Sequence, residues 1–406
     1  MCLIACVAVT SALDAFRSEV RAWLDAACPA SMRTPIPSPD EDVWGGRRAV
    51  FPCDDARAWF TRMVERGWTA PTWPHEYGGA GLARNEAAVL GEELRRIGAR
   101  PPLKSLGLWM LGPLLLEVGT EEQKREHLPR IARGEIRWCQ GFSEPGAGSD
   151  LASLQTRAVR DDAGWTVDGQ KVWTSQADKA DWIFCLVRTD TAAKKHEGIS
   201  FLLIDMTTPG VRTRPISLIS GASPFCETFF EGVRVPERNL VGAPGEGWTL
   251  AKRLLEHERD AISRMRDAQS QEEEPLEAIA KRCLGTNEDG ALSDPILRDE
   301  LTQTNLDFLC NQLTLRRSQE TIAAGRPPGP EISMLKLYGT ELNQRRRELL
   351  VRMAGFQGLG WEGDAFTKTD LQRTRDWLRS RANSIEGGSS EIQLNIIAKR
   401  VLGLPD

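Results

Sequence analysis

The chain has 406 residues, which is enough to bury a substantial core and to form two or three domains. Its 52 basic and 57 acidic residues nearly balance and give a formal net charge of -5. This balance argues against a broad surface for binding nucleic acid or anionic membranes. We therefore expect a soluble globular protein with no nucleic-acid partner and no membrane partner.

Nine cysteines are scattered along the chain without a Cys-x-x-Cys pair, and only four histidines accompany them. This pattern favours reduced thiols in a cytoplasmic protein over a disulfide framework or a zinc site. The apolar residues 2–9 lack a cationic start and are too few to span a bilayer. We expect residues 1–10 to be a loose N-terminal extension.

Residues 11–137 are expected to form an all-helical domain. In the segment SALDAFRSEVRAWLDAA, the apolar Leu13, Phe16, Val20 and Leu24 recur at helical spacing. Gly and Pro in PTWPHEYGGAG separate this segment from two further helical stretches, RNEAAVLGEELRRIG and LKSLGLWMLGPLLLEVG.

The pattern changes near Trp138 to short runs rich in aromatic and β-branched residues, such as GWTVDGQKVWTS, ADWIFCLVRTD and GISFLLIDM. Asp168-Gly169, between two alternating runs, predicts a hairpin turn. Residues 138–243 are therefore predicted to form an antiparallel β-barrel or sandwich. Helical periodicity returns afterwards, so residues 244–406 are predicted to be a helical domain, and the fold class is multidomain α+β.

Two familiar motifs can be excluded. EPGAGSD at 144–150 would need glycine at position 151 to complete a dinucleotide-binding Gly-x-Gly-x-x-Gly, and that residue is Leu151. HERDA at 257–261 has Ala261 where a zinc protease helix would carry its second histidine. A glycine-rich turn between two domains can still present backbone N–H groups to an anionic or polar ligand.

Three long segments resemble, in order, signatures of the acyl-CoA dehydrogenase family. WCQGFSEPGAGSDLASLQTRA resembles the first signature, DGQKVWTSQADKADW the flavin-facing strand pair, and GGSSEIQLNIIAKRVLGLP the closing signature, in its actinobacterial type. The resemblance covers nearly the whole chain after the extension. It implies an N-terminal helical domain, a β-barrel and a C-terminal four-helix bundle. It also implies FAD bound between barrel and bundle and shared with a neighbouring subunit of a homo- or hetero-oligomer.

The resemblance assigns four residues of the β-domain to the flavin. Phe142 and Ser143 match positions that contact the isoalloxazine through backbone and hydroxyl groups. Trp173 matches the tryptophan beside the ring, and Ser175 the hydroxyl near N5. Stacking can hold a flat aromatic cofactor, and hydrogen bonds near N5 tune its acceptance of hydride. Without the flanking motif, Trp173 would read as an ordinary barrel tryptophan.

Two residues are assigned to the substrate by the same resemblance. Ser149 matches a contact to the pantetheine chain near the thioester, and Arg259 matches a contact to CoA on the first bundle helix. Each has an ordinary alternative, because Ser149 suits a turn and Arg259 suits a solvated helix face. The phosphates of CoA would attract a cation such as Arg259.

Four residues of the C-terminal domain are assigned to FAD. Arg298 falls where the family has a flavin-contacting glutamine, although the Arg-x-x-Phe pattern that precedes it in many members is absent here. Gly355, in RMAGFQG, matches a glycine at the adenine dinucleotide. Ser389 and Glu391 match FAD contacts of the closing signature, and Ser389-Ser390 is also a good helix start.

Two glutamates compete for the role of catalytic base. The implied reaction needs a carboxylate that removes an α proton while the β hydrogen leaves as hydride. In many members this base directly precedes the closing Gly-Ser-Ser, where this chain has Gly387, so Glu386 lies one residue too early. Other members carry the base on the first bundle helix, directly before the CoA-contacting arginine, where this chain has Glu258. Glu258 is the first candidate and Glu386 the second. The third possibility is that neither residue is the base.

The resemblance implies FAD-dependent α,β-dehydrogenation of an acyl-CoA to the trans-2-enoyl-CoA, with electrons passed to an electron-transfer flavoprotein, in fatty-acid or steroid side-chain catabolism. Two alternatives remain open at this point. The chain could be a low-activity or structural subunit of a heteromeric dehydrogenase, as the departures at Arg298 and Gly387 suggest. It could also be a flavin oxidase or monooxygenase on the same fold, although Ser149 and Arg259 argue against this.

Overall fold

The computed structural model describes residues 2–36, 41–270, 274–323, 329 and 332–405, while the side chains of residues 2–11, 259–270 and 322–323 lie outside this description. The chain divides into two compact units. The first unit comprises Met1–Ile216 with Pro224–Gln271, and the second comprises Ser217–Ser223 with Glu272–Asp406.

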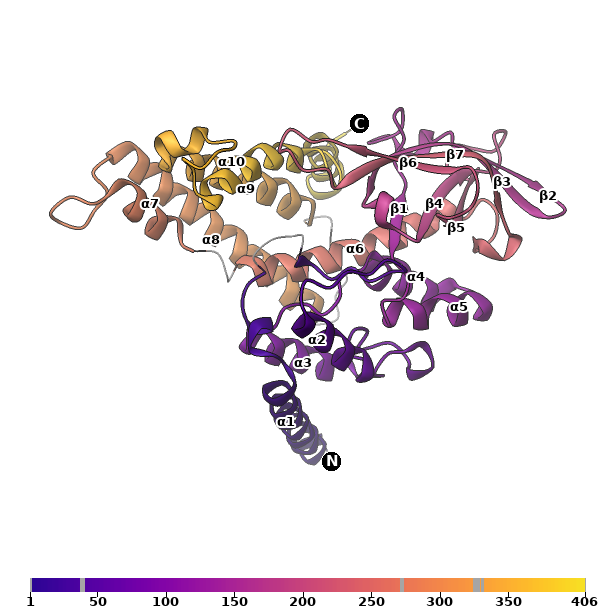
Figure 1. The fold of residues 1–406 in the computed structure, drawn as a ribbon, viewed down its shortest axis with the longest axis horizontal. Coiled ribbons are helices and arrows are strands. Elements are labelled where there is room, and N and C mark those ends of the chain that lie inside the picture. The colour runs from indigo at the N-terminus through magenta and orange to yellow at the C-terminus, as the bar shows by residue number, and fades with distance from the viewer. Residues whose placement is uncertain (1, 37–40, 271–273, 324–328, 330–331, 406) are drawn as a thin grey trace. The chain divides into compact units, whose positions relative to one another are not determined.

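The helices of the first unit come before and after its β-strands in the chain (Figure 1). They are α1 (Cys2–Ala27), α2 (Asp54–Glu65), α3 (Arg84–Arg96), a π-helical turn (Gly107–Leu111), α4 (Gly112–Val118), α5 (Glu121–Ala132) and α6 (Gly247–Ser270). This confirms the helical N-terminal part. Helix α1 begins at Cys2, however, so residues 2–10 continue a helix where a loose extension was expected. No Gly or Pro occurs in that segment, so nothing in it interrupts the helical hydrogen bonds.

Helices α1 and α3 are joined by a buried carboxylate. Glu93 on α3 is only 1% exposed and accepts hydrogen bonds from Arg17 (3.2 Å), Arg21 (2.8 and 3.0 Å) and Arg96 (2.5 Å). The hydrogen bonds from Arg21, and then those from Arg96 and Arg17, lower the pKa of Glu93 to about 2, although burial acts in the opposite direction. Glu93 is therefore ionised wherever the protein is folded under ordinary conditions.

Between α5 and α6 in the chain, the first unit forms a β-sheet (Figure 1). Its strands are β1 (Trp138–Gly141), β2 (Arg157–Asp161), β3 (Gly164–Ser175), β4 (Trp182–Arg188), β5 (Ile199–Asp205), β6 (Val211–Ile216), β7 (Phe225–Val235) and β8 (Leu240–Val241). The order is β6-β7-β3-β2-β4-β5-β8, and β1 pairs with β4 off this path. The pairings are antiparallel except β1 with β4 and β2 with β4, which are parallel. The predicted β-domain is confirmed, with a mixed sheet.

The predicted hairpin at Asp168-Gly169 is wrong. β3 runs through both residues, and the chain turns earlier, between Asp161 and Gly164. The dipeptide marks an irregularity in the pairing of β3 with β7, where the register shifts between Val167 and Gly169. A side chain at Gly169 would meet the backbone of Thr156 at 2.7 Å, so the glycine is needed for close approach and not for a turn.

Strand β4 is buried on both faces and contributes to two cores. Its odd and even positions alternate between them, as the period of a strand requires. One core contains Trp182, Phe184 and Leu186 together with residues of α4, α5 and α6. The other lies within the β-domain and contains Ile183, Cys185 and Val187. This double burial fixes the sheet and α6 relative to each other within the first unit.

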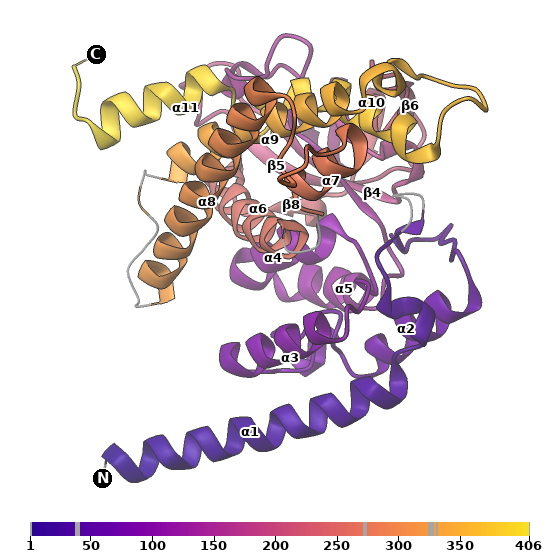
Figure 2. The same cartoon turned by 90° about the vertical axis from the view of Figure 1, so that its left-hand side faces the viewer.

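The second unit is helical (Figure 2), which confirms the predicted helical C-terminal part. Its helices are α7 (Leu276–Leu284), α8 (Pro295–Ala323), α9 (Ile332–Met353), α10 (Lys368–Ser380) and α11 (Ser390–Ile396). Apolar residues of α7, α8 and α9, such as Ile279, Leu301 and Leu350, form its core. Within the described residues, no helix combines the length and the apolar composition that crossing a bilayer requires.

Candidate active site

The turn after β1 begins with the two residues expected to face a flavin. The ring of Phe142 is buried edge-on against Phe184 (6.1 Å) and Phe201 (6.2 Å), so Phe142 can offer a ligand only its backbone. Its carbonyl oxygen accepts a hydrogen bond from the Lys171 ammonium (3.1 Å). The next carbonyl, that of Ser143, accepts the backbone N–H of Val172 (2.9 Å). Both carbonyl groups are therefore held by β3.

A buried ion pair closes this turn. The Lys171 ammonium lies 2.7 Å from the carboxylate of Glu144, and neither side chain is appreciably exposed. The same carboxylate accepts the backbone N–H groups of Gln155 (2.6 Å) and Thr156 (2.8 Å). Burial would raise the pKa of Glu144, but the charge and hydrogen bond of Lys171 and the hydrogen bonds of residues 155 and 156 hold it below its usual value.

Trp173 lies in a strained bulge of β3. Its φ of +60° is in the left-handed region, which large side chains rarely adopt, and the pairing with β7 shifts register between Lys171 and Thr174. The indole is 54% exposed and makes a T-shaped contact with the ring of Phe225, at 6.0 Å between ring centres. The bulge thus turns a large flat ring outward from the sheet. Backbone strain of this kind is concentrated at functional sites.

Ser175 and Ser149 complete the expected contacts of the β-domain. Ser175 is half-buried at the end of β3, two residues beyond Trp173, where it pairs with Phe225. Ser149 is exposed in the glycine-rich turn, beside Asp150, whose carboxylate pairs with Lys195 (2.5 Å). The structure therefore places Phe142 and Ser143 in the turn after β1 and Trp173 and Ser175 on the adjoining β3, with Ser149 farther along the turn.

Helix α6 carries the first candidate for the base. It packs against α4 (Figure 2), the π-helical turn and β5, and its buried face includes Ala251 and Leu254. Glu258 follows Leu254 by four residues and Ala251 by seven, so it lies on the same face, and it is half-buried. The neighbouring His257 reaches Glu117 of α4 at 3.1 Å. The side chain of Arg259, the expected contact for CoA, lies outside the described residues.

Glu386, the second candidate, is an exposed carboxylate of the second unit. Arg379 donates a hydrogen bond to one of its oxygens, and Asn383 donates to the other, each at 2.6 Å. Lys336 holds the same loop to α9 by donating to the carbonyl oxygens of Asn383 (3.1 Å) and Gly388 (2.6 Å). Both oxygens of Glu386 are thus occupied by donors of its own loop and helix.

The closing signature forms the predicted helix start. Ser389 is the N-cap of α11, and its hydroxyl accepts the backbone N–H of Ile392 at 3.4 Å. Glu391, in the first turn, is exposed, and hydrogen bonds from its own backbone and from Ser389 lower its pKa. Gly387 has a φ of +64°, and nothing lies within 4 Å of the position that its side chain would occupy.

The other two expected FAD contacts are on separate elements of the second unit. Arg298 is exposed in the first turn of α8. Gly355 begins a short 3₁₀ turn (Gly355–Leu359) after α9 and has a φ of +55°, and nothing lies within 4 Å of the position that its side chain would occupy. Neither position makes a described contact that would identify a ligand, so both assignments remain predictions.

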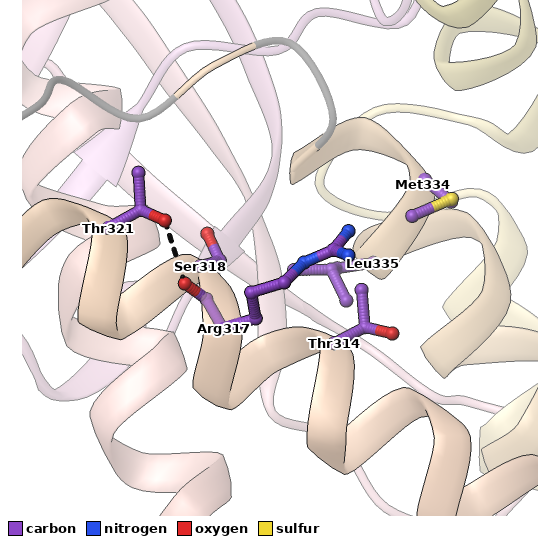
Figure 3. Close-up of a pocket in the computed structure, with 6 residues that line it drawn as sticks. All are labelled: Thr314, Arg317, Ser318, Thr321, Met334 and Leu335. Carbon is purple, nitrogen blue, oxygen red and sulfur yellow. Dashed lines mark hydrogen bonds between the residues drawn. The ribbon is translucent and has the colours of Figure 1, made fainter.

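A small cavity of about 60 Å³ lies between the end of α8 and the start of α9 (Figure 3). Its lining residues include Arg317 and Thr321, and the Thr321 hydroxyl donates to the backbone oxygen of Arg317 at 2.9 Å. Ligand sites for cofactors usually have volumes of about 300 Å³ or more. This cavity is therefore too small for a flavin or an acyl-CoA, and none of the expected site residues lines it. Nor does any group of three potential metal ligands occur in the described part of the chain.

Two residues of the site were not found from the sequence, Glu144 and Lys171. Both stand inside the quoted segments EPGAGSD and DGQKVWTS, but a single charged residue in a turn or a strand usually faces solvent. The sequence offers only a weak signal, and only for Lys171, which follows Gly169 in a run whose alternate residues are apolar. Their pairing depends on the contact between β1 and β3, which no local pattern reveals.

Comparison with known proteins matches the whole architecture. Residues 10–135 match the N-terminal domain of acyl-CoA dehydrogenase, residues 139–233 its middle domain and residues 245–402 its C-terminal domain. These ranges leave the exact domain boundaries as predictions. They begin only after the first nine residues of the chain.

Relatives and a solved structure agree with these matches. Acyl-CoA dehydrogenase IpdE1 of Mycobacterium tuberculosis is 36% identical over 394 residues, covering 97% of this chain and 98% of IpdE1. Acyl-CoA dehydrogenase FadE34 of the same organism is 40% identical over 84% of this chain, which spans only 45% of the length of FadE34. The Tcur3481-Tcur3483 steroid ACAD superposes with a TM-score of 0.74 at 31% identity, covering 97% of this chain and 98% of that one. The chain belongs to the acyl-CoA dehydrogenase family.

Proposed function

We propose that this protein is an FAD-dependent acyl-CoA dehydrogenase that converts an acyl-CoA to the trans-2-enoyl-CoA and passes the electrons to an electron-transfer flavoprotein. The observation that carries the proposal is the exposed ring of Trp173, held in a strained bulge next to the turn of Phe142 and Ser143. These are the positions at which the family resemblance expects the isoalloxazine.

The residues present fit a flavin. The exposed indole of Trp173 offers a flat face to a flat ring system, and stacking is favourable for such pairs. The carbonyl groups of Phe142 and Ser143 are engaged with β3, and Ser175 supplies a half-buried hydroxyl beyond the ring. The chemistry supplied by bound FAD is acceptance of the β hydrogen as hydride. Ser389 and Glu391, with Gly355 and Arg298, are proposed to contact the rest of the cofactor.

Glu258 is the proposed base, which removes the α proton of the thioester. A base for so weak an acid must be held close to its target and be partly shielded from water. Glu258 is half-buried on the packed face of α6, whereas Glu386 is exposed. Ser149 is proposed to contact the pantetheine, and Arg259 the CoA phosphates.

A bulky, steroid-like acyl group is the proposed substrate class. The support is the similarity over nearly the full chain to a structure named a steroid ACAD. Gly387 also leaves space at the closing signature where a side chain would otherwise project. Chain length is not specified by these features, so the acyl group is a matter for direct screening.

A second candidate function is that of one subunit of a heteromeric dehydrogenase. Helix α8 exposes Leu306, Leu309 and Leu313 at helical spacing, each more than half exposed, so this stripe suits burial against another chain. The Tcur3481-Tcur3483 structure is named for two polypeptides. Association of identical chains would bury the same stripe.

One experiment distinguishes these proposals. The purified protein is loaded with FAD and mixed anaerobically with short, long, branched and steroid side-chain acyl-CoAs, while flavin absorbance and the mass of the product are followed. Bleaching together with loss of two mass units from the acyl-CoA supports the dehydrogenase. Absence of bleaching by the chain alone, restored by a co-purified second dehydrogenase chain, favours the subunit role.

A further inference from the structure

The two segments expected to hold the flavin are far apart in sequence and are joined by one buried lysine. Lys171 comes from β3, and it donates to the carbonyl of Phe142 (3.1 Å) and to the carboxylate of Glu144 (2.7 Å) in the turn after β1. The adjacent backbone bond from Val172 to Ser143 (2.9 Å) continues this connection. No other ammonium in the described residues is fully buried.

Burying this pair is costly, so its retention calls for a reason. Desolvation of a buried ion pair often cancels its Coulombic attraction, and well-packed apolar residues of similar volume can be equally stable. Lys171 has no exposed surface, and the carboxylate of Glu144 needs three hydrogen bonds to be accommodated. An apolar pair would fill the space but could not donate to the carbonyl oxygen of Phe142, which the Lys171 ammonium holds in direction.

The pair also fixes one side of the bulge that carries Trp173. Lys171 and Thr174 flank the register shift, and both side chains are fully buried. With both flanks fixed, the two residues between them must absorb the change of register, and Trp173 does so with a φ of +60°. Lys171 thus holds the turn of Phe142 through its ammonium and flanks the bulge of Trp173 through its place in β3.

We propose that Lys171 and Glu144 are a positioning pair that aligns the turn at Phe142 and Ser143 with the bulge at Trp173 so that both contact one cofactor ring. They act through these residues and do not themselves touch the flavin. The proposal rests on the proposed binding of FAD, and it adds two residues to that site whose effect on the cofactor can be measured separately from catalysis.

The test compares a single and a double substitution. Lys171→Met removes the ammonium but leaves Glu144 charged and buried, so this variant is expected to lose stability. Lys171→Met/Glu144→Gln carries no charge in the pair and keeps one amide oxygen that can accept the backbone N–H of residue 155 or 156, so it should fold. The control is Arg234→Met, which breaks an exposed ion pair with Asp161 in the same sheet (2.6 Å).

Three quantities are measured on each variant: the dissociation constant for FAD, the visible spectrum of bound flavin, and amide hydrogen exchange at Val172 without FAD. We expect the double variant to bind FAD about tenfold more weakly, with an altered spectrum, since a lost buried hydrogen bond costs about that much. We also expect its Val172 amide to exchange about tenfold faster. The Arg234→Met control should match the wild type in all three.

A double variant with wild-type FAD affinity, spectrum and Val172 exchange would overturn the proposal, because a purely stabilising pair is replaceable by a neutral one. A wild-type protein that binds no FAD would instead contradict the proposed function. In that case the exchange rate at Val172 still decides whether the pair connects the two segments.

Discussion

Glu258 lies one helical turn beyond Leu254 on α6, on the face that Leu254 buries completely in the first unit. This relationship places a carboxylate at the edge of the packed surface of the helix. Glu256, two residues earlier, faces solvent on the same helix. The two glutamates therefore form a matched pair in which one is the proposed base and the other is a control.

Glu258→Gln should slow anaerobic reduction of the flavin by acyl-CoA by about a thousandfold, within the range of general base catalysis. The amide keeps the size of the side chain but cannot take up the α proton. Glu256→Gln and Glu386→Gln should react at nearly the wild-type rate, because Glu256 is exposed and Glu386 is engaged by Arg379. Stopped-flow absorbance measures all three. A fast Glu258→Gln together with a slow Glu386→Gln would reverse the assignment.

Substitutions of Trp173 should separate backbone strain from cofactor binding. Both Trp173→Ala and Trp173→Gly remove the ring, so both should weaken FAD binding by about tenfold, the value of a lost stacking contact. Glycine adopts a φ of +60° without steric cost, whereas alanine does not. The free energy of unfolding should therefore be about 1 kcal/mol higher for the glycine variant than for the alanine variant. Urea unfolding and FAD titration measure the two effects. Equal stability of the two variants would show that the bulge is not strained.

His127 should make the protein less stable in mild acid. It is buried between the rings of Trp138 (5.3 Å) and Trp182 (5.0 Å), and burial, followed by the charges of Arg130 and Arg238, lowers its pKa from 6.5 to about 4. His127 therefore becomes protonated below pH 6.5 in the unfolded chain but only below about pH 4 in the folded chain. As the pH falls from 6.5 to about 4, the free energy of unfolding should decrease by up to about 1.4 kcal/mol per pH unit. A His127→Phe variant with the same pH dependence as the wild type would contradict this origin.

Glu93 should affect the stability of the protein at a lower pH than His127 does, through the contact between α1 and α3. Its pKa is about 2 in the folded protein and 4.5 without its partners, so the stability that it contributes is complete above pH 4.5 and is lost as the pH falls toward 2. Glu93→Gln should remove this dependence and lower the free energy of unfolding by about 2 kcal/mol at neutral pH, as expected for lost charged hydrogen bonds. Chemical unfolding at several pH values measures both. Glu92→Gln, on the exposed neighbour, is the control.

Local patterns predicted the order of helical, β and helical parts because each depends on periodicity along the chain, as in Leu13, Phe16, Val20 and Leu24. The hairpin at Asp168-Gly169 was wrong because the same dipeptide suits a turn or a bulge, and only the close approach to Thr156 decides. The resemblance to the family assigned residues to the flavin one by one, and these assignments stay predictions. It gave no indication of the Lys171–Glu144 pair, which depends on a contact across 27 residues.

The central claim is that the chain itself oxidises an acyl-CoA with bound flavin. The measurement that tests it most directly is the absorbance of the FAD-loaded protein after anaerobic mixing with a steroid side-chain acyl-CoA. The account predicts rapid bleaching of the flavin with formation of one equivalent of the trans-2-enoyl-CoA. An FAD-loaded protein whose flavin stays oxidised with every acyl-CoA tested, alone or with a partner chain, would contradict it.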